Sequence, residues 1–136
     1  MLVGNSLSSL FSDILFSFQG NGKFDPSMDP TLVAKLEKLC PSPTSTSSKD
    51  PNVFLDQNTS FTFDNSYYKQ LQLKRGILQI DQEIASDTST KNIVTSFATN
   101  GNAFSQSFVN AIIKMGNIGV LTGNNGEIRT NCRAVN

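Results

Sequence analysis

The chain has 136 residues, with eleven basic and eleven acidic side chains that are interspersed along the sequence, and it contains no histidine. This balance excludes the extended charged field that draws nucleic acid or anionic membranes, so we expect neither as a partner. The length suits one domain or part of one, and the two cysteines lack the spacing of a zinc cluster or of a CxxC redox site.

The first eighteen residues predict one amphipathic helix that ends before Gly20 and Gly22. Asp13 interrupts the apolar run and no basic segment precedes it, so we expect neither a signal peptide nor a membrane-spanning helix here. The apolar positions recur at helical spacing: Val3, Leu7, Leu10, Phe11, Ile14 and Phe18.

A turn-rich connector over residues 20–30 leads to a predicted helix over 31–39, which Pro41 terminates. Residues 41–50, PSPTSTSSKD, have almost nothing to bury and predict a flexible polar loop. The next helix is expected over 67–74, with Asp64 and Asn65 as caps and Gly76 at its left-handed end.

Three more helices are expected, near residues 81–85, over 90–99 and over 104–115. The last carries the strongest apolar stripe and is predicted to be a core helix, with a break at residues 100–102 before it. After a turn at residues 124–126 the chain ends in extended form. The fold class is therefore mainly α, with little or no strand.

Several strings in this order resemble the class III haem peroxidases, the secretory peroxidases of plants. The resemblance covers about residues 16–136 and extends more weakly to Met1. It implies that residues 1–136 form a partial domain, the C-terminal or proximal part of the plant haem peroxidase fold. The matching strings are FSFQGNGKFDPSMDP, KLEKLCP, FLDQNTSFTFDNSYYKQL, GILQIDQEI and FSQSFVNAIIKMGNIGVLTGNNGEIRTNCRAVN.

The resemblance places Met1 at the position of the family's proximal histidine, which ligates the haem iron, and Leu2 at the threonine beside it. The family's distal histidine and distal arginine have no counterpart in this sequence. Asp81 matches the aspartate that accepts a hydrogen bond from the proximal histidine and so strengthens that ligand. From the residues alone, an aspartate near a helix start is a cap.

Asp56, Thr59, Thr62 and Asp64 match the family's proximal calcium loop, in which oxygen atoms surround a hard cation. The family site also uses the threonine whose position Leu2 takes, so we expect weak calcium binding or none. A turn followed by a helix cap explains the two carboxylates equally well.

Cys40 and Cys132 match family cysteines whose partners this chain lacks, since one partner position is Ser8 and the other has no counterpart. We therefore expect two free thiols and no disulfide; a bridge between them would require a rearranged fold. Asn58-Thr59-Ser60 is an acceptor triplet for N-glycosylation, relevant if the chain enters the secretory route.

Full-length members of the resembled family use haem b, calcium and hydrogen peroxide to oxidise phenolic donors, act in responses to oxidative stress, and are extracellular or vacuolar. We expect this chain alone to be catalytically inactive and not to bind haem firmly, with Met1 a poor substitute for the axial histidine. The alternative is a non-enzymatic helical binding module or a non-functional remnant. The oligomeric state stays open.

Overall fold

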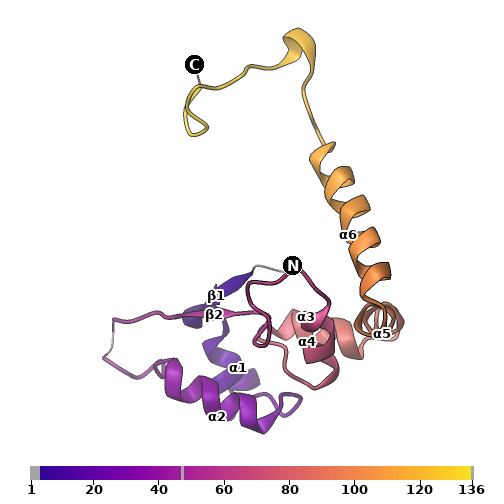
Figure 1. The fold of residues 1–136 in the computed structure, drawn as a ribbon. Helices are drawn as coiled ribbons and strands as arrows, with labels where there is room; N and C mark the ends of the chain where they lie inside the picture. The colour runs from indigo at the N-terminus through magenta and orange to yellow at the C-terminus, as the bar shows by residue number, and fades with distance from the viewer. Residues whose placement is uncertain (1–3, 47, 136) are drawn as a thin grey trace. The chain divides into compact units, whose positions relative to one another are not determined.

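The structure is a computed structural model that describes residues 4–46 and 48–135. In these residues, six α-helices account for most of the regular structure, and the strands form one two-stranded sheet (Figure 1). The mainly α class expected from the sequence is confirmed. None of the helices described is long and apolar enough to cross a membrane.

The N-terminal segment differs from the single helix that its periodicity predicts. It forms a strand β1 (Asn5–Leu7), a 3₁₀ turn (Ser8–Phe11) and a short helix α1 (Ser12–Phe16). β1 pairs antiparallel with β2 (Asn52–Phe54). The pairing satisfies backbone groups through a partner far along the chain, and this overrides the local helical pattern.

Helix α2 (Pro30–Leu39) forms where the sequence predicts it. The Asp29 side chain caps it by accepting from the Leu32 amide at 2.9 Å, Pro30 occupies the first helical position, and Arg75 pairs with Asp29 at 3.0 Å. The first hydrophobic cluster joins this helix to α1 and β2 and comprises Phe11, Ile14, Leu15, Met28, Leu32, Val33, Leu36, Cys40, Val53 and Ile77.

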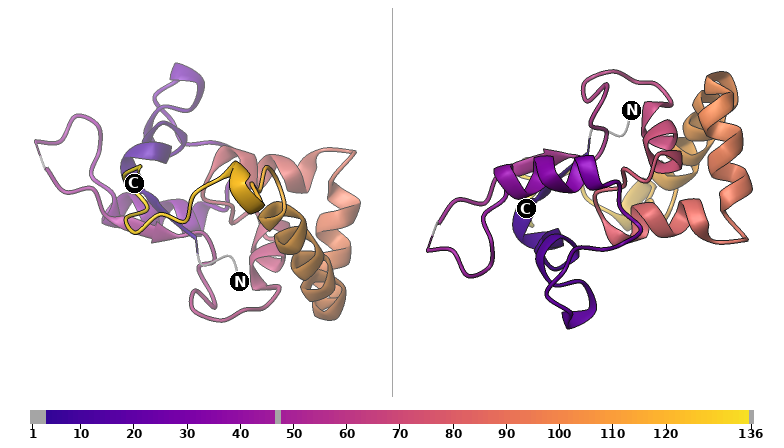
Figure 2. Two further views of the ribbon diagram at one scale, coloured as in Figure 1. Left: turned by 90° about the horizontal axis from the view of Figure 1, so that it is seen from above. Right: turned by 90° about the horizontal axis from the view of Figure 1, so that it is seen from below.

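Helices α3 (Ser66–Gln72), α4 (Gln79–Ser86) and α5 (Lys91–Thr99) pack against one another around Tyr67, Leu71 and Val94 (Figure 2). The Asn65 side chain, expected to cap α3, makes no capping hydrogen bond there and binds α5 instead. Its amide donates to the carbonyls of Phe97 and Ala98 at 2.8 and 2.9 Å. These carbonyls belong to the last turn of α5, which has no partners for them inside the helix.

The left-handed residue after α3 is Lys74, at φ 61°, and not Gly76 as predicted. Glycine is favoured at position 76 for another reason, since a Cβ there would make tight contacts, 3.0 Å from the Gln82 amide nitrogen and 3.1 Å from the Asp81 Cβ. The absent side chain lets the backbone approach the first turn of α4, where Asp81 lies.

The described chain divides into two compact units, one ending at Ser105 and the other beginning at Gln106. Helix α6 (Gly101–Gly116) starts in the first unit, where the Asn100 side chain caps it by accepting from the Ala103 amide. The predicted break between the two helices is confirmed, because α5 ends at Thr99 and Asn100 is extended, but α6 begins at Gly101 and not at residue 104. The second unit contains the rest of α6 and a 3₁₀ turn (Gly123–Asn125).

The prediction of a core helix over 104–115 holds only at its start. Phe104 is buried, whereas Val109, Ile112, Ile113 and Met115 are each more than two-fifths exposed. Within the second unit, the described residues after α6 form only a short turn and extended chain, so no helix or sheet of that unit packs on the stripe.

Candidate functional site

The carboxylate of Asp81 is buried at the first turn of α4, with 5% of the residue exposed. The Tyr67 hydroxyl, on α3, donates to its Oδ1 at 2.7 Å, and the Leu78 backbone amide donates to its Oδ2 at 2.9 Å. Each oxygen of this carboxylate therefore has a donor from the chain itself.

This geometry confirms the cap that an aspartate at a helix start predicts, because the Leu78 amide is one of the donors left free at the start of α4. It adds a partner that the sequence pattern did not single out, Tyr67. A buried carboxylate without hydrogen bonds would be strongly unfavourable. The hydrogen bonds from Tyr67 and Leu78 offset this cost of burial, although no imidazole is present to donate to the carboxylate.

Both tyrosines of the chain lie in this region and are held neutral. Burial raises the pKa of Tyr67 strongly, and the neighbouring Asp81 carboxylate raises it further. Burial also raises the pKa of Tyr68. The Tyr68 ring packs edge-on against Tyr67, Phe97 and Phe104 at centroid distances of 5.2 Å, so the ring of Tyr67 adjoins an aromatic cluster.

A second polar cluster lies between β2 and α3. The Thr59 hydroxyl is 3.0 Å from Oδ2 of Asp56 and 3.0 Å from Oδ1 of Asp64, and the hydroxyl of Ser66 is 3.3 Å from Oδ1 of Asp56. Asp56 and Ser66 are buried. The same carboxylates fix the loop by accepting from the backbone amides of Asn58 and Ser66.

Of the four residues expected in this cluster, the structure brings together Asp56, Thr59 and Asp64. Thr62 has an exposed side chain and contributes its backbone amide to the Thr59 carbonyl. Ser66 joins the cluster although it was not predicted; its place directly after Asp64-Asn65 in the string FDNSYY was the available signal.

Carboxylate and hydroxyl oxygens converging on one loop suit a hard cation. However, no group of three or more histidine, cysteine, aspartate or glutamate side chains suited to a metal ion occurs in residues 4–46 and 48–135. In the structure the Thr59 hydroxyl already bridges the two carboxylates, and the Ser66 hydroxyl donates to Asp56. Weak calcium binding or none therefore stays a prediction.

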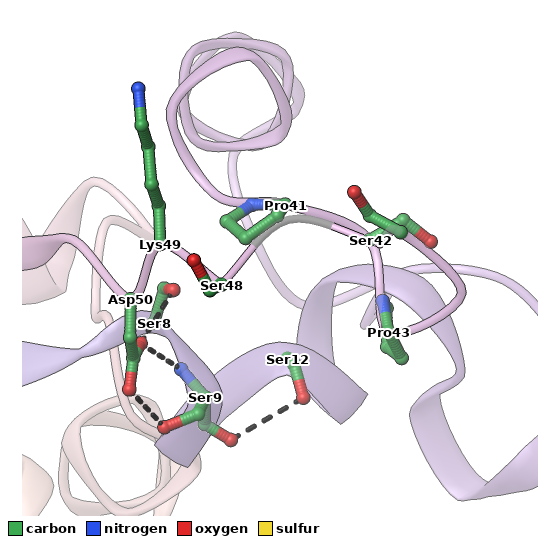
Figure 3. A pocket seen from close by; sticks show the side chains of 10 residues that line it. Ser8, Ser9, Ser12, Pro41, Ser42, Pro43, Ser48, Lys49 and Asp50 are labelled. Atoms are coloured by element: carbon green, nitrogen blue, oxygen red, sulfur yellow. Dashed lines mark hydrogen bonds between the residues drawn. The ribbon is translucent and has the colours of Figure 1, made fainter.

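Cys40 is buried at the end of α2, in contact with the Ser8 side chain, and burial raises the pKa of its thiol. Ser8 and Ser9 both donate to the Asp50 carboxylate, at 2.9 and 2.7 Å. These groups line a surface pocket together with residues of the polar 41–50 loop (Figure 3). Ser8 therefore lies beside the Cys40 thiol.

Both cysteines are free thiols, and Cys132 is exposed in the second unit. Met1 and Leu2, which the resemblance places at the axial ligand and beside it, lie outside the described residues. The sequence has no histidine, so its 136 residues offer no imidazole to haem iron.

Residues 3–100 match the family model described as peroxidase. The chain is 47% identical to Peroxidase 57 of Arabidopsis thaliana and 39% identical to the lignin-forming anionic peroxidase of Nicotiana tabacum, each match covering 98% of this chain. It is 44% identical to Peroxidase 15 of Ipomoea batatas, again over 98% of its length. In each case the match covers 40% or 41% of the relative, so the chain spans about two-fifths of these proteins.

The buried tyrosines predict a loss of stability in alkali. In the unfolded chain tyrosine ionises near its ordinary pKa of about 10. In the folded chain the pKa of both tyrosines is raised. The free energy of unfolding is therefore unaffected by these groups below pH 10, and it falls above pH 10, where the unfolded chain loses protons that the folded chain retains. Absorbance at 295 nm and circular dichroism at 222 nm, followed in one pH titration, should change together. Tyrosinate appearing near pH 10 with the helices intact would contradict the burial of these hydroxyls.

The contact between Ser8 and Cys40 predicts that S8C forms a disulfide with Cys40. The closed loop of more than thirty residues should stabilise the oxidised protein by about 4 kcal/mol in urea unfolding, less the contribution of the hydrogen bond to Asp50 that the substitution removes. Wild type should keep both thiols, and oxidised S8C should keep the one at Cys132. S9C, changed at the neighbouring exposed serine, is the matched control and should gain no stability; equal behaviour of the two variants would show that Ser8 does not face Cys40.

Proposed function

The chain belongs to the peroxidase family, and we propose that it corresponds to the part of a haem peroxidase that carries the carboxylate partner of the axial histidine. The observation that carries this proposal is the buried Asp81 carboxylate, held in one orientation by Tyr67 and Leu78. A carboxylate held in this way accepts a hydrogen bond from an imidazole with little reorganisation. The complete reaction would be oxidation of phenolic donors by hydrogen peroxide, in a secreted or vacuolar protein.

Haem b does not fit the residues of this chain by themselves. Bound haem would supply the oxidising chemistry, but in the peroxidase family an imidazole holds its iron, and none of the 136 residues is histidine. No residue here takes the role of the distal acid–base pair that acts on peroxide. We propose that these residues alone do not catalyse peroxide-dependent oxidation, and that an axial imidazole must come from other polypeptide.

Calcium fits the loop before α3 better, although weakly. Asp56 and Asp64 would hold the ion, with Thr59 contributing its hydroxyl oxygen. A bound cation would neutralise two neighbouring carboxylates and fix the start of α3, the helix that carries Tyr67. In this way the calcium loop would support the orientation of Asp81.

A non-enzymatic helical binding module is the second candidate. The observation in its favour is the exposed apolar stripe of the second unit, because single exposed apolar residues are ordinary but a continuous stripe marks a contact surface. A monodisperse sample with sharp, dispersed NMR signals would favour this module. Broad lines with strong ANS fluorescence would instead indicate a remnant that does not fold uniquely.

Addition of haemin tests the proposed inactivity. The purified chain should give no Soret band of a histidine-ligated haem and no guaiacol oxidation above that of haemin alone. The D81N variant serves as a control, since it should behave like wild type when no imidazole is present for Asp81 to orient. Turnover clearly above the haemin background would refute the proposal.

Calorimetric titration tests the cation loop. We expect a dissociation constant for Ca²⁺ of about 1 mM or weaker, because two carboxylates and a hydroxyl give fewer strong ligands than a high-affinity site. D64N keeps an oxygen acceptor for the Ser66 amide but removes a charge, and it should abolish the heat of binding. E37Q removes one charge from the exposed face of α2 and should leave binding unchanged. Micromolar affinity in the wild type would contradict a weak site.

A further inference from the structure

Residues of the connector after α1 and of one side of α4 line a polar pocket of about 300 Å³ in the first unit. Phe18 and Asp25 line it from the connector. The residues from α4 follow one another at intervals of three, one and three, so they share one side of the helix: Gln79, Gln82, Glu83 and Ser86. This volume lies at the lower end of the range for ligand pockets, so the pocket suits a small molecule.

A buried carboxylate in this pocket has one oxygen that receives no hydrogen bond. Asp25 is 5% exposed, and its Oδ1 accepts from the Ser27 amide at 2.7 Å. No described residue donates to its Oδ2. Every fully enclosed side-chain oxygen or nitrogen among the described residues has a partner, so Oδ2 is not enclosed and opens into the pocket that Asp25 lines. A carboxylate removed from most of its water is stabilised when a ligand supplies the missing donor.

The pocket is negatively charged. Glu83 contributes a second carboxylate, whose Oε1 accepts from the Gln79 side chain at 2.6 Å. In the part of the chain that the structure describes, neither Asp25 nor Glu83 lies within ion-pair distance of a lysine or an arginine. Two carboxylates at one hollow, without a basic side chain among its lining residues, attract a cation and repel an anion.

These groups suit a guanidinium cation better than a metal ion. Over residues 4–46 and 48–135, no group of three or more histidine, cysteine, aspartate or glutamate side chains could hold a metal. A guanidinium carries five N–H donors in one plane and donates to a carboxylate through two parallel hydrogen bonds. Its flat face also packs on aromatic rings, and Phe18 provides a ring at this pocket. We propose that the pocket binds a small guanidinium ligand, whose N–H groups donate to Asp25 and Glu83.

The backbone holds the connector side of the pocket in place before a ligand binds. The Phe18 amide donates to the Lys23 carbonyl at 2.7 Å, and the Asp25 amide donates to the Ile14 carbonyl at 2.8 Å. Glu83 lies inside α4, so its backbone is also fixed. A site whose acceptors are already positioned loses less conformational entropy on binding. The pocket therefore needs no rearrangement of the chain to accept the ligand.

Titration of the purified chain with methylguanidinium chloride, at constant ionic strength and without calcium, tests the site. Calorimetry should show saturable binding with a dissociation constant on the order of 1 mM. In NMR spectra the side-chain amide signals of Gln79 and Gln82 should shift over the same concentrations. D25N keeps the oxygen that accepts from Ser27 but removes the charge, and it should weaken binding about tenfold or more. E83Q should also weaken binding, and it supplies a second test if D25N does not fold.

D13N is the matched control, because it removes one charge from an exposed residue of α1 that does not line the pocket. D64N, in the cation loop, separates the pocket from that loop. Both variants should bind methylguanidinium as wild type does. Tetramethylammonium carries the same charge without N–H donors and should bind about tenfold more weakly or less.

Absence of saturable binding in the wild type would overturn the proposal. Equal affinity of wild type, D25N and E83Q would contradict it as well, and equal affinity for tetramethylammonium would exclude recognition through N–H groups. Neither haem nor peroxide takes part in these titrations, so their result is independent of the proposed function.

Discussion

The arrangement of α3 and α4 depends on one buried carboxylate. Asp81 is removed from water, and burial of an ionised group is tolerated only where hydrogen bonds replace the lost hydration. Tyr67 provides one of these bonds across the helix interface, and the Leu78 amide provides the other. Gly76 permits the close backbone approach that brings Leu78 and Asp81 into position. The carboxylate, the tyrosine and the glycine thus form a single constraint on this part of the fold.

The helices with local signals were predictable from the sequence. Asp29, Pro30 and Pro41 define α2 by capping and by blocking continuation, and such effects act within one or two turns. The strand β1 was not predictable in this way, because its apolar spacing suits a helix and only the pairing with β2 selects the extended form. The stripe on α6 was predicted to be buried, since periodicity identifies an apolar face but not the element that covers it.

In the candidate site, too, some residues were predictable from the sequence and others depend on tertiary packing. Asp56, Thr59 and Asp64 were found through the resemblance, and the structure joins their side chains. Thr62 does not enter that network through its side chain, and Ser66 does. The pairing of Tyr67 with Asp81 spans fourteen residues, and no local rule connects a tyrosine in one helix with a cap in the next. Contacts of this kind depend on how α3 and α4 pack, which a single sequence does not specify.

The central claim is that the chain itself satisfies the Asp81 carboxylate, chiefly through Tyr67. A double-mutant cycle with Y67F, D81A and the combined variant, measured by urea unfolding, isolates this pair from other effects of each substitution. The account predicts a coupling free energy of about 1.5–3 kcal/mol, as for a buried hydrogen bond to a charged group. Additive effects of the two substitutions, with coupling near zero, would contradict it.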